Sequence, residues 1–281
     1  MSLTQKGRDS MRTLLRFIAL LLTLLCLTPA LAEEAGPFPA LRGWSKQDGY
    51  VYLTLGSFPQ TKEGERLPIL WRVLTVEEDR ALLLSEYILE ARPLHGDYKE
   101  YANKPTNKKQ PGFSGDYTQT DMAKYLNGDF TANFAQGELD ALTEDETLGL
   151  FFLLSGDELK NAAYGFTSNE SRKAWGTEYA LANGLFKYMA NRGSHSPYWT
   201  STQSTSNTQG ARCIKSKGEI GYINVITEDE GMRPACWLRL DQARIDEGDG
   251  TREAPYTLLP VPGSDEPIVT ELVPLTPATD E

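Results

Sequence analysis

Histidine is nearly missing from this chain, and cysteine is scarce. The 281 residues include two histidines, His95 and His195, and three cysteines. Two imidazoles are too few for a multi-histidine metal centre. Neither histidine is accompanied by a complete catalytic motif, and a G-x-S-x-G nucleophile elbow is missing near His195. The sequence therefore predicts no bound metal, no cofactor and no catalytic residues.

The chain also lacks an excess of positive charge and a long apolar run. Its formal charge is −11 and its pI about 4.9, which argues against nucleic-acid binding because phosphate contacts need clustered Lys and Arg. The longest apolar-dominated run, Phe17 to Leu27, covers about 16 Å as a helix, against roughly 30 Å for a bilayer core. We expect neither a nucleic-acid partner nor a membrane span in the mature chain.

Residues 1–32 have the organisation of a signal peptide. Basic residues precede the apolar run, and Ala30-Leu31-Ala32 follows as a small-x-small cleavage motif. Cleavage there would remove four basic residues and one acidic residue, so the charge would fall from −11 to −14. An uncleaved anchor is the alternative, and Met11 is an alternative start. We expect a secreted, periplasmic or cell-envelope protein.

The remaining chain divides by composition into three parts. Residues 33–47 are an irregular lead-in, and residues 48–245 have the length and composition of one folded domain. Residues 246–281 are rich in proline and acidic residues, which predicts an extended or disordered tail. The apolar residues 256–259 leave docking on the domain as an alternative.

The domain has an α+β pattern, with strands at both ends and short helices between them. A hairpin is predicted where two β-prone runs flank Glu77-Glu78-Asp79. Thr120 or Asp121 is placed to cap a helix that ends at Asn127-Gly128, and Ser155 with Glu158 forms a capping box. Further strands are expected at residues 50–55, 150–154, 211–215, 221–227 and 232–240.

Six segments occur in a recognisable order: Gly56-Ser57-Phe58-Pro59-Gln60, Pro68 to Leu74, Ala81 to Ser85, Tyr125-Leu126-Asn127 with Phe130, Phe152 to Ser155, and Met232 to Leu238. Together they resemble a bacterial family of uncharacterised exported domains that is similar in fold to C-type lectin domains and sulfatase-modifying factors. The resemblance spans about residues 48–240. It implies a C-type-lectin-like fold with antiparallel sheets and several short helices, and it brings no established catalytic residue.

Two residues of these segments invite a structural interpretation. Arg233 is expected to bridge core strands or to pair with a carboxylate, because a single arginine beside core strands more often bridges than binds a ligand. Cys236 stands where the resembling family has an aliphatic residue. With Cys213, it would form a disulfide in an oxidising compartment. Two buried free thiols are the alternative.

The segment from Ser194 to Arg212 has the composition of a binding loop. Tyr198 and Trp199 are followed by Thr200, Ser201 and other small polar residues, a mixture common in adaptable binding surfaces. We therefore take Tyr198, Trp199, Thr200, Ser201 and Arg212 as candidate binding residues. The alternative places Trp199 in the core.

Two classes of function follow from these observations. The first is an exported, non-catalytic recognition domain that binds a glycan, a peptide or another cell-envelope component through its loop face. The second is an oxidoreductase-like enzyme related to sulfatase-modifying factors. The 23-position separation of Cys213 and Cys236 disfavours it, because those factors use closely spaced cysteines. A structural accessory role in the envelope is a further alternative.

Overall fold

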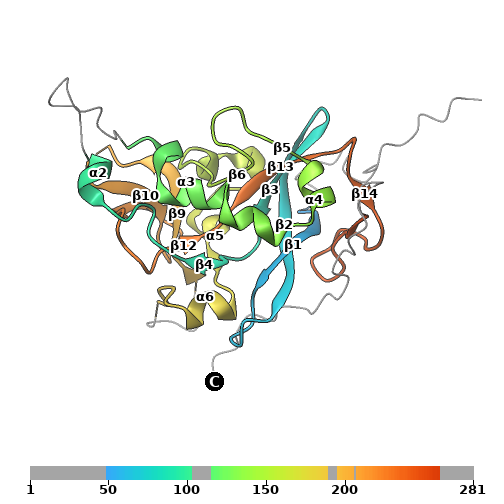
Figure 1. Ribbon diagram of the computed structural model, residues 1–281, viewed down its shortest axis with the longest axis horizontal. Coiled ribbons are helices and arrows are strands. Elements are labelled where there is room, and N and C mark those ends of the chain that lie inside the picture. The colour runs from blue at the N-terminus through green and yellow to red at the C-terminus, as the bar shows by residue number, and fades with distance from the viewer. Residues whose placement is uncertain (1–48, 103–114, 189–194, 206, 260–281) are drawn as a thin grey trace, which may run out of the picture. The chain divides into compact units, whose positions relative to one another are not determined.

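The computed structural model describes residues 49–102, 115–188, 195–205 and 207–259 (Figure 1). The chain divides into two units, Met1–Gly36 and Pro37–Glu281, and every described residue belongs to the second. The predicted signal peptide, the lead-in and residues 260–281 lie outside the described residues. The described part is a mixed fold with antiparallel sheets and several short helices, as the sequence predicted.

The larger sheet has six strands and only antiparallel pairings. The predicted hairpin is confirmed, since Glu77 pairs with Arg80 across a turn in which Glu78 has a φ of 43°. Five strands lie in the order β1 (Tyr52–Pro59), β2 (Arg66–Glu77), β3 (Arg80–Ser85), β13 (Ala235–Arg239) and β5 (Leu142–Thr143), and β6 (Phe151–Phe152) also pairs with β13.

The second sheet has five strands, and one of its pairings, between β12 and β9, is parallel. The strand order is β11 (Ile220–Asn224), β10 (Gly210–Ile214), β9 (Tyr198–Gln203), β12 (Gly231–Met232) and β4 (Glu90–Ala91). Because β4 is an edge strand, one of its sides is open to elements outside the sheet. Two small sheets pair β7 (Ala174–Trp175) with β8 (His195–Ser196), and β14 (Arg244–Ile245) with β15 (Leu258–Leu259).

The helices are all short within the described ranges. They are α2 (Tyr98–Ala102), η2 (Tyr117–Gln119), α3 (Asp121–Leu126), η3 (Asp129–Asn133), α4 (Gln136–Asp140), η4 (Glu158–Lys160), η5 (Ala162–Tyr164), α5 (Asn169–Arg172) and α6 (Glu178–Ala182). Thr120 caps α3 by accepting a hydrogen bond from the Ala123 N–H at 3.1 Å. The capping box of Ser155 and Glu158 is also present, with reciprocal bonds of 2.7 and 3.1 Å.

The α3–η3 segment packs on the larger sheet, where it contacts β6 and β1 (Figure 1). An aromatic cluster forms the core between them. The ring centroids of Phe134 and Phe151 are 4.5 Å apart, and those of Phe130 and Phe151 are 5.2 Å apart. Trp71 is fully buried and donates from Nε1 to the Leu55 carbonyl at 2.8 Å. Gly56 is required beside this cluster, because its φ is +66° and a Cβ there would collide with the Phe134 ring.

The predicted continuous strand at residues 232–240 is wrong in one respect. The chain leaves the five-stranded sheet after Met232 and enters the six-stranded sheet at Ala235, so one apolar run supplies strands to both sheets. Pro234 has no N–H to add to a ladder, which suits a position between strands. Arg233 is 1% exposed there and donates from Nε to the Ser85 carbonyl at 2.9 Å. The bridging role expected for Arg233 is thus present.

The sequence predicted an extended or disordered tail over residues 246–281, with docking of residues 256–259 on the domain as the alternative. In the described part of this segment, residues 246–259 lie on the domain. Tyr52 donates its N–H to the Gly250 carbonyl at 2.9 Å, and Tyr256 donates to the Tyr52 carbonyl at 3.0 Å. Leu258 pairs with Ile245. Burial of Leu258, and backbone bonds to the free side of β1, outweigh the proline-rich and acidic composition.

Candidate functional site

Three of the four candidate binding residues on β9 lie in the core, which corrects their sequence-based assignment. Tyr198, Trp199 and Thr200 are at most 2% exposed. Trp199 donates from Nε1 to the Arg92 carbonyl at 2.9 Å, and Thr200 donates to the Arg212 carbonyl at 3.0 Å. A ring buried on a central strand offers no face to a ligand, so the alternative placement of Trp199 in the core is the one that the structure has.

Ser201 and Arg212 are partly exposed, on the neighbouring strands β9 and β10. Ser201 donates its N–H to the Leu154 carbonyl at 3.1 Å. Neither residue lines the pocket described below. The segment predicted as a loop therefore contains the strand β9 and the start of β10, and its polar side chains form hydrogen bonds within the fold.

The two described cysteines are free and buried, so the structure does not contain the predicted disulfide. Cys213 lies on β10 opposite Gly221, and Cys236 lies on β13 opposite Leu83, in different sheets. Burial, with the Glu230 carboxylate as a further cause, raises the pKa of the Cys213 thiol to about 12. Burial also raises the pKa of Cys236. Both groups are thiols at neutral pH, the weakly reactive form.

A buried ion cluster surrounds Glu86, directly after β3. Its Oε2 accepts from Arg72 Nε at 2.7 Å, and its Oε1 lies 2.9 Å from Arg252 NH2. Arg233 approaches the same segment and donates to the Glu86 carbonyl at 3.3 Å. Burial acts to raise the pKa of the Glu86 carboxyl, but the three guanidinium groups together hold that pKa below its usual value. The cluster connects β2, the end of β3 and residues 246–259, so we assign it a role in stabilising the fold.

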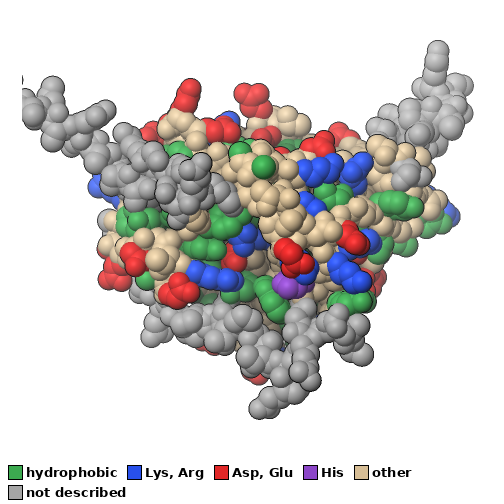
Figure 2. All heavy atoms as spheres, turned by 180° about the vertical axis from the view of Figure 1, so that it is seen from behind, with side chains coloured by type: hydrophobic (Ala, Val, Ile, Leu, Met, Phe, Trp, Pro, Cys, Tyr) green, Lys and Arg blue, Asp and Glu red, His purple; other side chains and the backbone are tan. Residues whose placement is uncertain are grey.

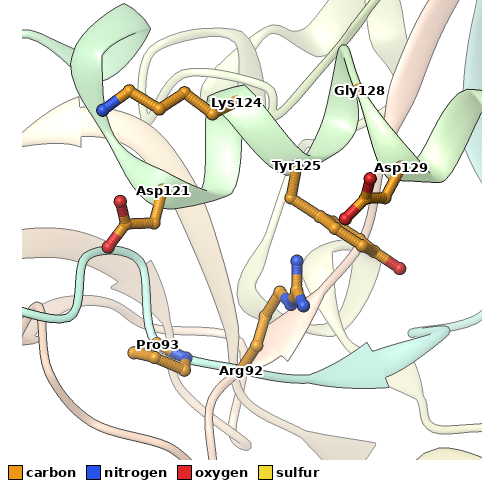
Figure 3. Close-up of a pocket in the computed structure, with 7 residues that line it drawn as sticks. All are labelled: Arg92, Pro93, Asp121, Lys124, Tyr125, Gly128 and Asp129. Atoms are coloured by element: carbon orange, nitrogen blue, oxygen red, sulfur yellow. The ribbon is translucent and has the colours of Figure 1, made fainter.

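A pocket of about 410 Å³ opens beside the edge strand β4. It lies between the segment that follows β4 and the α3–η3 segment (Figure 3). Charged groups of both signs and one aromatic ring surround it. The lining residues are Arg92, Pro93, Asp121, Lys124, Tyr125, Gly128 and Asp129.

The Arg92 side chain is held in the pocket by contacts with Tyr125 and Glu90. Its guanidinium carbon lies 3.3 Å from the centroid of the Tyr125 ring, a cation–π contact visible in Figure 3. The Tyr125 hydroxyl donates to Glu90 Oε2 at 3.1 Å, and Glu90 Oε1 lies 3.5 Å from Arg92 Nε. Burial and then the Glu90 charge raise the pKa of the Tyr125 phenol, which keeps it protonated as a donor. Glu90 and Tyr125 thus fix the plane of the guanidinium.

Asp121 is the first residue of α3, one turn before Tyr125, and its side chain contacts the segment before α2. Its Oδ2 accepts from the Gly96 N–H at 2.8 Å and lies 3.2 Å from His95 Nδ1. His95 is 2% exposed and also approaches Glu100, at 3.5 Å from Nε2 to Oε2. These contacts leave Asp121 half exposed, with its carboxylate held at the pocket rim.

A second hollow, of about 710 Å³, lies at the tip of the β2–β3 hairpin, where residues 77–80 meet Thr143 and Arg239. Its two cations already have partners. Arg80 pairs with Glu77 at 3.0 Å and lies over the Trp237 ring, and Arg239 pairs with Asp241 at 3.1 Å. Because the Arg92 guanidinium donates no hydrogen bond within the described ranges, the pocket beside β4 is the better candidate.

Sequence reasoning named three of the pocket residues, but only in structural roles: Asp121 as a possible helix cap, Tyr125 in a segment of the family resemblance, and Gly128 at the end of the helix. The other four residues of the pocket were missed. One signal was available: Asp121, Lys124 and Tyr125 are polar at positions i, i+3 and i+4 of a predicted helix, which places them on one face. No pattern in the sequence joins that face to Arg92. Within the described ranges no group of three or more His, Cys, Asp or Glu side chains is placed to hold a metal.

His195, on β8, packs against Trp175, with ring centroids 4.3 Å apart. Burial, and then the charge of Lys173, lower the pKa of its imidazole. Among the helices that the structure describes, none is long and apolar enough to cross a membrane.

Comparison with known proteins gives one match. The model of a family described as "Domain of unknown function (DUF6273)" matches residues 78–240, which include both sheets' central strands and the pocket beside β4. Neither a curated protein nor a solved structure matches the chain.

Proposed function

We propose that this chain, which belongs to the DUF6273 family of domains, is an exported bacterial recognition domain that binds its ligand without chemical change. The observation that carries the proposal is the pocket beside β4, where a stacked arginine and an anchored carboxylate face the same hollow. The ligand belongs to the polar components of the cell envelope, glycan or peptide. We also propose that the two sheets have a C-type-lectin-like arrangement, which the sequence resemblance implies.

Several features support binding over catalysis. Both described cysteines are buried with raised pKa values, which opposes the copper-dependent cysteine chemistry that a relation to sulfatase-modifying factors would imply. Three pocket residues are held in place, Arg92 by the Tyr125 ring, Tyr125 by a hydrogen bond to Glu90, and Asp121 by the Gly96 N–H, an arrangement that suits recognition. Charges of both signs are interspersed on the face seen in Figure 2. The pocket beside β4 is likewise lined by two cationic and two anionic residues, which suits a small polar ligand better than a polyanion.

Export is tested separately from binding. Mass spectrometry of the protein from the culture medium or periplasm should find Glu33 at the N-terminus, because the Ala30-Leu31-Ala32 motif predicts cleavage after Ala32. An intact terminus at Met1 or Met11 on the mature protein would contradict export by cleavage.

Binding is tested with a panel of glycan and peptidoglycan fragments against the purified chain, its Arg92→Gln variant and a control, Arg244→Gln. Arg244 is an exposed arginine on β14, outside the pocket. At least one fragment should bind the parent and the control, and Arg92→Gln should weaken that binding tenfold or more. Equal binding by all three proteins, or no binding by any fragment, would refute the proposed site.

A further inference from the structure

We propose that two copies of this chain pair along the edge strand β11, in antiparallel orientation about a two-fold axis at Tyr222. β11 and β4 are opposite edges of the five-stranded sheet, so this surface is separate from the pocket beside β4, and the inference does not depend on the proposed function. Three observations carry it: the edge is unprotected, its free backbone groups are self-complementary, and the charges at its two ends are opposite in sign.

The edge formed by β11 differs from the other edges of the described sheets. On the free side of β1, Tyr52 donates a backbone hydrogen bond to Gly250 and accepts one from Tyr256. The other edge strands in the described ranges have two residues each. β11 has five, Ile220–Asn224, with no charged residue, no proline and no register shift against β10. Because sheets usually protect an edge with charges, prolines, bulges or a covering segment, β11 has the properties of a pairing site.

The backbone of β11 presents donors and acceptors at the free side. Val225, just after the strand, donates its N–H to the Gln209 carbonyl, on the β10 side. Since the backbone groups of successive residues point to opposite sides of an antiparallel strand, those of Ile220, Tyr222 and Asn224 point away from β10. In the described ranges, the N–H groups of Ile220 and Tyr222 donate no hydrogen bond. These groups are therefore available to a further strand.

The free groups match those of a second β11 that runs in the opposite direction. With the axis at Tyr222, the two Tyr222 residues exchange N–H···O=C bonds, and Ile220 exchanges them with Asn224 of the second copy. The two Tyr222 side chains then lie directly opposite each other, with about 5.5 Å between their Cα atoms. Tyr222 is 53% exposed in one copy, and an aromatic pair across the strands would cover part of that surface.

The charges beside β11 favour a second copy of this chain in the same orientation. Lys217 is exposed before the strand, and Glu228 is exposed after it. The two-fold axis brings the end that carries Lys217 to the end of the second copy that carries Glu228, so opposite charges approach each other. Glu219, the charged residue next to the strand, would lie opposite Val225 of the second copy. The pairing thus places no like charges directly opposite each other beside the strand.

The test is sedimentation equilibrium of the purified chain and of variants that place a charge on the axis. The parent should form a dimer, and a weak one, because five residues per chain make a small interface. Tyr222→Lys and Tyr222→Glu should each weaken self-association tenfold or more, since two like charges would then face each other. An equimolar mixture of the two variants should form a mixed dimer at least tenfold tighter than either variant forms with itself.

Recovery in the mixture separates the inference from loss of fold, because a misfolded variant would not regain association. The control, Phe186→Lys, charges another exposed apolar residue outside β11 and should keep the parent's dissociation constant. A parent that stays monomeric up to millimolar concentration would overturn the inference and leave the edge to a strand of another kind. A mixture that associates no more tightly than its components, or equal weakening by Phe186→Lys, would also overturn it.

Discussion

Glu86 accepts a hydrogen bond from Arg72 at 2.7 Å while its side chain is only 5% exposed. The same carboxylate contacts Arg252, which arrives from the C-terminal segment. One buried anion therefore compensates Arg72 on β2 and Arg252, which lies 166 positions after Glu86. Its removal would leave Arg72, whose side chain is 12% exposed, without its carboxylate partner. Glu86 is thus one of the residues that connect residues 246–259 to the larger sheet.

Replacing Glu86 with Gln should lower the free energy of unfolding by about 3–5 kcal/mol, because breaking a buried ion pair leaves an uncompensated charge. Urea unfolding at pH 7 measures the change. The matched control is Glu77→Gln, which breaks the exposed pair with Arg80 and should cost less than about 1 kcal/mol. Similar losses for both variants would contradict the role assigned to Glu86.

The same pair predicts an acid limit of stability. The folded-state pKa of Glu86 lies below its unfolded value near 4.5, so its contribution is complete above that value and is lost as the pH falls through the folded pKa. The parent should lose stability faster than Glu86→Gln as the pH is lowered from 5 to 3. Parallel curves for the two proteins would be evidence against this assignment.

Ionisation of Glu230 should have the opposite effect to that of Glu86, because it should lower the stability of the folded protein. It is 3% exposed, and its Oε2 has no hydrogen-bond partner within the described ranges. Burial raises its pKa to about 7, against a lowering by Lys215 and a further rise from Asp229. A raised carboxyl pKa means that the folded state binds the proton more tightly, so stability falls as the pH rises from about 4.5 through about 7.

Glu230→Gln should therefore stabilise the protein at pH 8 by roughly 3 kcal/mol relative to the parent, since each pKa unit corresponds to about 1.4 kcal/mol, and should change little at pH 4. Thermal or urea unfolding at the two pH values measures this. Glu228→Gln, an exposed change in the same loop, should have no pH-dependent effect. If Glu230→Gln is no more stable than the parent at pH 8, the prediction fails.

The state of Cys213 and Cys236 is open to direct measurement. As buried free thiols they should resist a thiol reagent in the native protein and give two reactive groups in denaturant without reductant. A Cys26→Ser background keeps the third cysteine of the full chain out of the count. No reactive group in denaturant would establish the disulfide that the sequence predicted.

Asn127 joins α3 to β6 and the turn before it. Its Oδ1 accepts from the Leu150 N–H at 2.7 Å, and its Nδ2 donates to the carbonyls of Ala123 and Phe151 at 3.1 and 3.0 Å. Asn127→Ala should lower the free energy of unfolding by about 1–2 kcal/mol, because it removes bonds to several backbone groups. Asn183→Ala, at the same cap position of α6, removes one exposed side-chain bond and should cost about half as much or less. Equal losses would refute the joining role.

The local elements of this protein could be predicted from its amino-acid sequence. The β2–β3 hairpin, the Thr120 cap of α3 and the capping box of Ser155 and Glu158 were all predicted correctly, because each depends on residues within a few positions of one another. The mixed class with short helices followed from the same local patterns. The family resemblance was expected to span about residues 48–240, and the family model matches residues 78–240.

Which polar residues are available for binding depends on how the elements pack, and the sequence patterns did not predict it. Tyr198 and Trp199 belong to a segment with the composition of a binding loop. However, they lie on β9 inside a five-stranded sheet, and both rings are buried. Arg92 and Tyr125 are 33 positions apart, and the pocket exists because the edge strand β4 ends beside α3. Burial and contact between distant residues depend on the packing of whole elements, and a pattern with a period of two or 3.6 residues carries no information about which elements will meet.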